Sequence, residues 1–211
     1  MKAKLIIAAL LLCVSNAVFG QIVEGVEIGA DAGLGYIDGV DKRINGNLGF
    51  NFGLTFVQGL SGGLFYTHLN TNSEIDGRFS RSFGDNEFLY RSNYVGIYAK
   101  KIFFPNKLLR FSGFVKGGIG GTNYSNHVVT YGDDEDYIGT LHQKADKCFV
   151  TVVEPGGALE LKMRGQGIIF SLGATYRMFG NLKLQCDGYK IATGNDLDGV
   201  TVFFGITLRT N

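Results

Sequence analysis

The feature that most constrains this chain is a strict two-residue alternation near its C-terminal end. The even positions of 168–178 are apolar, whereas the odd positions between them are mostly small or polar, and 200–209 repeat the pattern. A period of two indicates a strand with one apolar and one polar face. A tilted strand needs roughly nine to eleven residues to cross a bilayer, so both segments are long enough to span one.

The same alternation recurs upstream and predicts further strands. Residues 182–187 also alternate, directly after the turn dipeptide Gly180-Asn181. The predicted set has eight strands: about 23–36, 47–57, 62–70, 88–103, 108–122, 168–178, 182–187 and 200–209.

Residues 123–166 are the hardest stretch to place. Two apolar bursts, 148–153 and 158–163, flank Pro155-Gly156-Gly157, which is typical of a hairpin turn. Each burst is short of a membrane crossing, so we predict a hairpin that stands above the membrane. The alternative counts both bursts as strands and gives a ten-stranded barrel.

The connections between the predicted strands alternate in length. Short turns are expected at 58–61, 104–107 and 179–181, and long or polar connections at 37–46, 71–87, 123–166 and 190–199. Outer-membrane barrels have short periplasmic turns and long extracellular loops. The sequence therefore predicts an all-β protein: a transmembrane antiparallel up-and-down β-barrel of eight strands (alternatively ten) with long extracellular loops.

The N-terminal segment is predicted to direct export. Lys2 and Lys4 precede an apolar run over 5–14 and then small residues, which is typical of a signal peptide over 1–20. Cleavage after Ala17 is an alternative. The remaining 21–211 would form one barrel domain in the cell outer membrane, after export through the inner membrane. The 20 basic and 19 acidic residues nearly balance, so the composition gives no reason to expect a nucleic-acid partner.

The polar faces of the predicted strands carry charges that would point into the barrel. One interpretation is a gate or narrow polar path controlled by ion pairs. The favoured interpretation is a satisfied charge network that plugs the barrel, since eight strands enclose little more than their own side chains. Bases exceed acids in this set, so water or the solvent-exposed ends would have to serve some cations. The candidate interior residues are Glu27, Asp31, Lys100, Arg110, Lys116, Arg177, Lys183, Asp187 and Arg209.

Catalysis has weak support in the sequence. His68 could lie at the outer rim with Ser73 or Ser92 as a nucleophile, but no spacing ties these residues together. We predict no enzyme activity, catalytic residue, cofactor or metal site. Acidic residues at 133–136 and 195–199 fit solvated loop charge better than a calcium loop.

Cys148 and Cys186 are expected not to form a disulfide. Cys186 is in phase with the lipid face of the predicted strand 182–187, whereas Cys148 is placed in the long connection. Export would permit a bridge between them.

Two stretches resemble a known family. Residues 173–185 (GATYRMFGNLKLQ) and 205–209 (GITLR) are similar to the closing strands of OmpA/OmpX-like eight-stranded outer-membrane barrels. Residues 93–100 (NYVGIYAK) resemble the fourth strand of "porin family" barrel proteins. The resemblance implies the barrel fold and an outer-membrane location.

Several functions are compatible with this expectation. The favoured one is a structural or surface-interaction role through the extracellular loops. The alternatives are a narrow porin-like channel, a soluble lipocalin-like periplasmic ligand binder, and an outer-membrane lipid-modifying enzyme. Expected partners are outer-membrane lipid and lipopolysaccharide, the barrel-assembly machinery during insertion, and a surface partner at 123–166.

Overall fold

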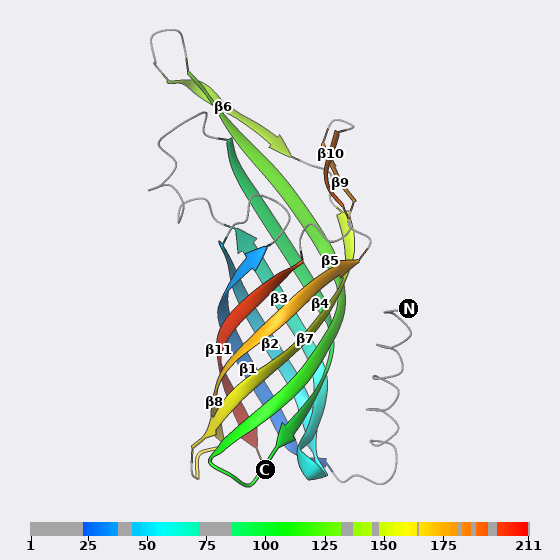
Figure 1. Cartoon of the computed structure of the whole chain (residues 1–211), viewed down its shortest axis with the longest axis vertical. Coiled ribbons are helices and arrows are strands. Elements are labelled where there is room, and N and C mark those ends of the chain that lie inside the picture. Colours follow the sequence, from blue (N-terminus) through cyan, green and yellow to red (C-terminus); the bar gives the residue numbers. More distant parts are fainter. Residues whose placement is uncertain are drawn as a thin grey trace.

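Eight strands of the described residues close into an antiparallel barrel (Figure 1). Each strand pairs with its neighbour around the barrel, and pairing of β4 with β5 and of β1 with β11 completes the circle. This confirms the predicted fold class and strand number. The wall strands are β1 (Val23–Ile37), β2 (Ile44–Phe56), β3 (Leu60–Thr71), β4 (Asn86–Phe103), β5 (Leu109–Tyr131), β7 (Cys148–Lys162), β8 (Ile168–Gly180) and β11 (Gly199–Thr210).

The computed structural model describes only part of the chain. The predicted signal peptide lies outside it, as does part of each connection predicted to be long. No helix among the described residues is long and apolar enough to cross a membrane. The described residues are 23–37, 44–71, 86–131, 137–144, 148–163, 165–180, 183–186, 189–193 and 198–210.

The wall turns its large apolar side chains outward and its charged side chains inward. Phe52, Ile97 and Leu172 are 53%, 61% and 58% exposed, whereas Glu27 and Arg177 are 1% and 0% exposed. In a soluble protein this burial would be inverted, because exposed apolar area is unfavourable in water. The outer surface is therefore suited to lipid, and the apolar faces do not enclose a lipocalin-like cavity.

The prediction for 148–163 is wrong. Residues Cys148–Lys162 form one continuous wall strand, β7, which pairs with β5 from Leu109↔Leu161 to Thr122↔Cys148. Pro155 has no N–H to donate, and pairing with β8 is interrupted between Val153↔Met178 and Gly156↔Thr175. Continuous pairing on the β5 side carries the strand through the Pro-Gly-Gly segment.

The prediction that 182–187 is a barrel strand is also wrong. Residues Lys183–Cys186 form β9, which pairs with β10 (Tyr189–Thr193) in a separate two-stranded sheet. Phe179 and Gly180 belong to β8, Asn181 lies outside the described residues, and the short connection lies between β7 and β8. As a result β8 runs in the opposite direction to the one predicted, although the total of eight strands is unchanged.

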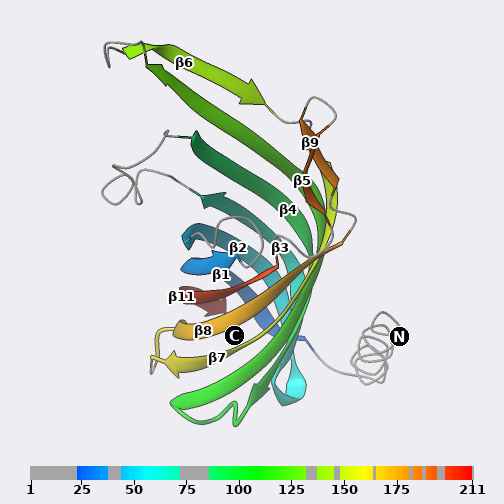
Figure 2. The same cartoon turned by 45° about the horizontal axis from the view of Figure 1, so that its top comes forward.

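The two ends of the barrel differ. One end has the short connections: η1 (Val57–Gly59) between β2 and β3, 104–108 between β4 and β5, and 163–167 between β7 and β8. At the other end β4 and β5 continue past the barrel, and β6 (Tyr137–Lys144) pairs with the upper part of β5 (Figure 2). This projecting sheet, β4–β5–β6, stands on the long-loop side.

Candidate functional site

The lumen is filled by ion pairs that link strands across the barrel. Near the short-turn end, the Lys100 ammonium on β4 lies 3.1 Å from a Glu27 carboxylate oxygen on β1 and 3.8 Å from Glu160 on β7. Arg110 on β5 contacts the same Glu160, with Nε and Nη2 each 2.8 Å from Oε2. These four side chains form a chain of alternating charge, so each buried carboxylate has a cation beside it.

Glycines make room for this arrangement. Tyr98 lies opposite Gly63, Gly63 opposite Gly53, and Gly53 opposite Glu27, in one row across four strands. The Tyr98 ring crosses this bare backbone, and its hydroxyl donates a 2.7 Å hydrogen bond to Glu27. A Cβ on Gly53 would meet the Tyr98 hydroxyl. Here the small-residue face accommodates a long inward side chain from another strand.

A second layer lies at Asp31 and Lys116. The Lys116 ammonium is 3.8 Å from the Asp31 carboxylate and also lies over the rings of Phe65 and Phe114, 5.6 and 5.8 Å from their centroids. The Asp31 carboxylate rests against the backbone of Gly49 on β2. Aromatic faces and a carboxylate together balance this cation.

The third layer, toward the long-loop end, is the most deeply buried. Arg177 on β8 donates from Nε to Glu154 on β7 at 2.5 Å and from Nη2 to the Thr201 hydroxyl at 3.1 Å. The Tyr94 hydroxyl donates to the same Glu154 oxygen at 2.5 Å. The guanidinium also lies 5.9 Å from the centre of the Tyr94 ring and 6.0 Å from that of Phe179. Side chains from β4, β7, β8 and β11 thus meet at one buried charge pair.

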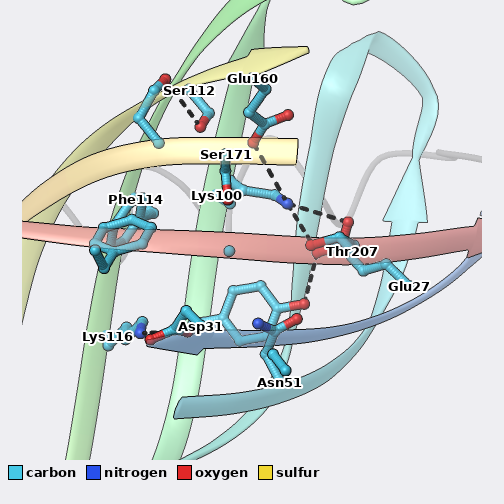
Figure 3. Close-up of a pocket in the computed structure, with 15 residues that line it drawn as sticks. Glu27, Asp31, Asn51, Lys100, Ser112, Phe114, Lys116, Glu160, Ser171 and Thr207 are labelled. Carbon is cyan, nitrogen blue, oxygen red and sulfur yellow. Dashed lines mark hydrogen bonds and ion pairs between the residues drawn. The ribbon is translucent and has the colours of Figure 1, made fainter. Parts of the chain in front are cut away.

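A small cavity of about 60 Å³ lies between the first two layers. Figure 3 shows Lys100 between Glu160 and Glu27 on one side of it, and Lys116 directed toward Asp31 on another. Charged and hydroxyl-bearing side chains contribute part of the lining, and this volume has room for several water molecules. It is far smaller than the aqueous channel of a wide porin.

The structure brings together most of the predicted interior residues. Glu27, Asp31, Lys100, Arg110, Lys116 and Arg177 all lie in the lumen, and Arg209 pairs with the more exposed Glu24 at 3.2 Å. Lys183 lies in β9 and not in the barrel wall. Asp187 lies outside the described residues.

The sequence-based set omitted Glu154 and Glu160. Both belong to β7, which was mistaken for an external hairpin. They provide carboxylates for Arg177, Arg110 and Lys100, so these three cations have partners that the sequence-based set did not contain, although Arg110 Nη1 is buried without a hydrogen bond to any described residue. A signal was present: from 148 to 160 the even positions, including both glutamates, keep one phase through Pro155.

The candidate catalytic residues do not come together. His68 points outward and contacts Asn93, whereas Ser92 is buried inside and accepts a hydrogen bond from Thr122. Ser73 lies outside the described residues, and His127 and His142 are register partners in the projecting sheet. Within the described residues no group of three or more His, Cys, Asp or Glu could hold a metal ion.

The acidic segments that were compared with calcium loops, and the two cysteines, are only partly described. Residues 133–136 and 195–197 lie outside the described residues, and Asp198 accepts a 2.7 Å hydrogen bond from the Phe179 amide. Cys148 begins β7 inside the wall and is not in a loop, whereas Cys186 belongs to β9.

Crowding between β2 and β3 gives a first testable prediction. A Cβ on Gly63 would meet the Phe52 carbonyl oxygen and the Gly53 Cα, both of them backbone atoms. Gly63→Ala should therefore lower the free energy of unfolding by about 1–3 kcal/mol through overpacking. Gly117→Ala is the matched control, because an added Cβ there meets nothing within 4 Å. Urea unfolding in detergent micelles measures both, and equal stabilities would contradict the close β2–β3 approach.

The chain matches no protein-family model and no curated protein. Among solved structures it is similar to Neisserial surface protein A (TM-score 0.52, 11% identity, 88% of this chain and 97% of that one). It is also similar to a major outer membrane protein from Thermus thermophilus (TM-score 0.50, 13% identity, 88% and 99%). At these identities the likeness concerns the fold, which is that of eight-stranded outer-membrane β-barrels.

Proposed function

We propose that this chain is an integral outer-membrane barrel whose lumen is closed by its own side chains and whose interactions take place at the long-loop end. The observation that carries the proposal is the inverted burial. Charged residues such as Arg177 and Glu154 are enclosed, while large apolar residues cover the outside. Such a wall is stable only where hydrocarbon replaces water.

The three layers of side chains support a plug in preference to a channel. Each layer spans the lumen between strands that are not neighbours in the barrel, as Lys100 on β4 does when it reaches Glu27 on β1. A solute would have to break one ion pair after another. We therefore favour a structural barrel over the narrow porin-like channel.

The projecting sheet supports a role in surface interaction. β5 is 23 residues long, more than the roughly nine to eleven needed to cross the membrane, so its upper part is available to other molecules. Paired backbone in β4, β5 and β6 gives this part a defined shape, which suits recognition. The partner is a ligand on the outside of the cell.

Heat modifiability and tag exposure test this proposal together. The washed membrane fraction should yield a band that migrates differently on SDS gels with and without boiling. A peptide tag inserted between Tyr131 and Tyr137 should be labelled on intact cells, and one inserted at Asn106 only after permeabilisation. Recovery in the soluble periplasmic fraction without a gel shift would refute the barrel, and the reverse labelling would refute the orientation.

The closed lumen gives a prediction for conductance. Purified wild-type protein inserted into planar bilayers should carry no steady current above that of the bare bilayer, because three successive layers of described side chains lie across the lumen. A wide porin in the same bilayer serves as the positive control. Regular conductance steps from a heat-modifiable preparation would favour the channel alternative.

A further inference from the structure

We propose that an outward-facing polar block on β3 and β4 binds the phosphate of a lipid A molecule. The polar block consists of His68, Asn70, Arg91 and Asn93. Lipid A binding at this block rests on the proposed function, because it requires the barrel to lie in the outer membrane. No residue of the block takes part in the charged lumen.

The four residues form two cross-strand pairs. His68 lies opposite Asn93 and Asn70 opposite Arg91, and all four alternate with inward neighbours that are fully buried, such as Leu69 and Ser92. They therefore share the outer face of the wall. Below them the same face is apolar, at Val95 and Ile97.

Hydrogen bonds fix the centre of the block. Asn93 Oδ1 accepts from the Tyr66 hydroxyl at 2.8 Å and lies 2.7 Å from His68 Nδ1. Because this oxygen can only accept, His68 donates through Nδ1. The Asn93 amide group then has two N–H donors to present, and Arg91 beside it adds the planar donor fork that suits phosphate.

The surface beside the block is open. Asn93 lies opposite Gly121 on β5, where an added Cβ would meet nothing within 4 Å, and Asn70 lies opposite Gly46 on β2. Bare backbone on both sides leaves space for a headgroup against the wall. Arg91 and Asn93, the exposed members of the polar block, are thus accessible from the lipid, whereas His68 and Asn70 are half-buried beside them.

The height of the block matches a headgroup layer. On the part of β4 from 91 to 103, the outward polar residues are Lys101 at the short-turn side and Asn93 and Arg91 at the other. Ten residues span about 33 Å of strand, or about 25 Å along the axis at a tilt of about 40°, which is the height of the apolar band of such barrels. The polar block therefore lies at the long-loop boundary, where the anionic phosphates of lipid A lie in an outer membrane.

The opposite boundary lacks an equivalent arrangement at Lys101. Its ammonium donates to the Gln58 carbonyl at 2.7 Å and so is already bonded to the η1 turn. Arg91 differs in that its side chain is exposed beside amide donors. Charge complementarity therefore favours an anionic headgroup at the polar block over one at Lys101.

The test measures lipid binding to the full-length barrel in detergent by native mass spectrometry. Wild type should bind phosphorylated lipid A about tenfold more tightly than dephosphorylated lipid A, as loss of one charge-assisted contact implies. Arg91→Gln should lose this preference. Asn93→Leu should weaken binding as well, and its apolar side chain on the outer face does not endanger folding. Lys107→Gln, in the turn at the opposite end, is the matched control and should bind like wild type.

Several results would overturn the assignment. Equal binding of the two lipid A forms by wild type would show that phosphate is not recognised. Equal binding of phosphatidylglycerol would show that any lipid phosphate suffices, and an equal loss in Lys107→Gln would indicate unspecific charge attraction. If wild type shows the heat-dependent gel shift but no phosphate preference, only this inference fails. If it shows no shift, the proposed function itself fails.

Discussion

Replacing Glu154 with leucine is expected to lower the free energy of unfolding by about 3–5 kcal/mol, the cost of leaving a buried charge without its partner. Arg177 is 0% exposed, and Glu154 is the carboxylate that it contacts in the described structure. The Tyr94 hydroxyl would lose its acceptor as well. The measurement is urea unfolding in lipid vesicles, followed by the gel shift between folded and unfolded bands.

A double replacement separates the charge effect from the packing effect. Glu154→Leu combined with Arg177→Met removes both charges at similar volume and should recover most of the lost stability, since buried ion pairs add little over apolar residues. Glu24→Gln is the comparison at the barrel end, where Glu24 is partly exposed beside Arg209, and should cost less than about 1 kcal/mol. A cost below about 1 kcal/mol for Glu154→Leu alone would mean that water reaches Arg177 and that the lumen is not closed there.

The second large effect is expected on the lipid-facing surface. Phe52→Arg places a cation in the middle of the apolar band and should cost about 2–4 kcal/mol in lipid vesicles. Phe52 is 53% exposed on β2, so no internal contact explains such a loss by packing alone. On the water-facing surface of a soluble protein, the same replacement would hardly change the free energy of unfolding.

Leu108→Arg is the matched control for depth. Leu108 is 48% exposed in the short connection between β4 and β5, where the cost for an arginine falls to about 0–1 kcal/mol near the interface. Comparison of the two variants by urea unfolding in vesicles therefore reports membrane depth. Equal costs for both would contradict the proposed position of the bilayer.

Face alternation was enough to predict seven of the eight wall strands, but not β7. At β7 two signals competed. Pro155-Gly156-Gly157 is a strong local turn signal, and β7 is apolar on its inner face too, at Val150 and Val152. Pairing with β5 along the whole strand overrides the local preference, and such long-range pairing is not visible in a single sequence.

The candidate site was also predictable only in part, because a single sequence does not show which distant strands pair. Strands with clear alternation revealed Glu27, Lys100 and Arg177 as inward residues. Their partners Glu154 and Glu160 depended on β7 and were missed with it. Which charges meet depends on the register of strands far apart in the chain, as Lys100 and Glu27 show, which are 73 positions apart.

The lateral span of the ion pairs has a consequence for how the barrel is made. Lys100 and Glu27 are 73 residues apart and Arg110 and Glu160 are 50 apart, whereas Arg177 and Glu154, 23 apart, meet within the β7–β8 hairpin. The first two pairs therefore form only once distant segments of the chain have come together. A sheet that entered hydrocarbon before its edges met would carry bare charges into it, at several kcal/mol each. We therefore expect the nascent sheet to keep its lumen hydrated until the last strands join, so that expulsion of water and locking of the ion pairs form the final step of assembly.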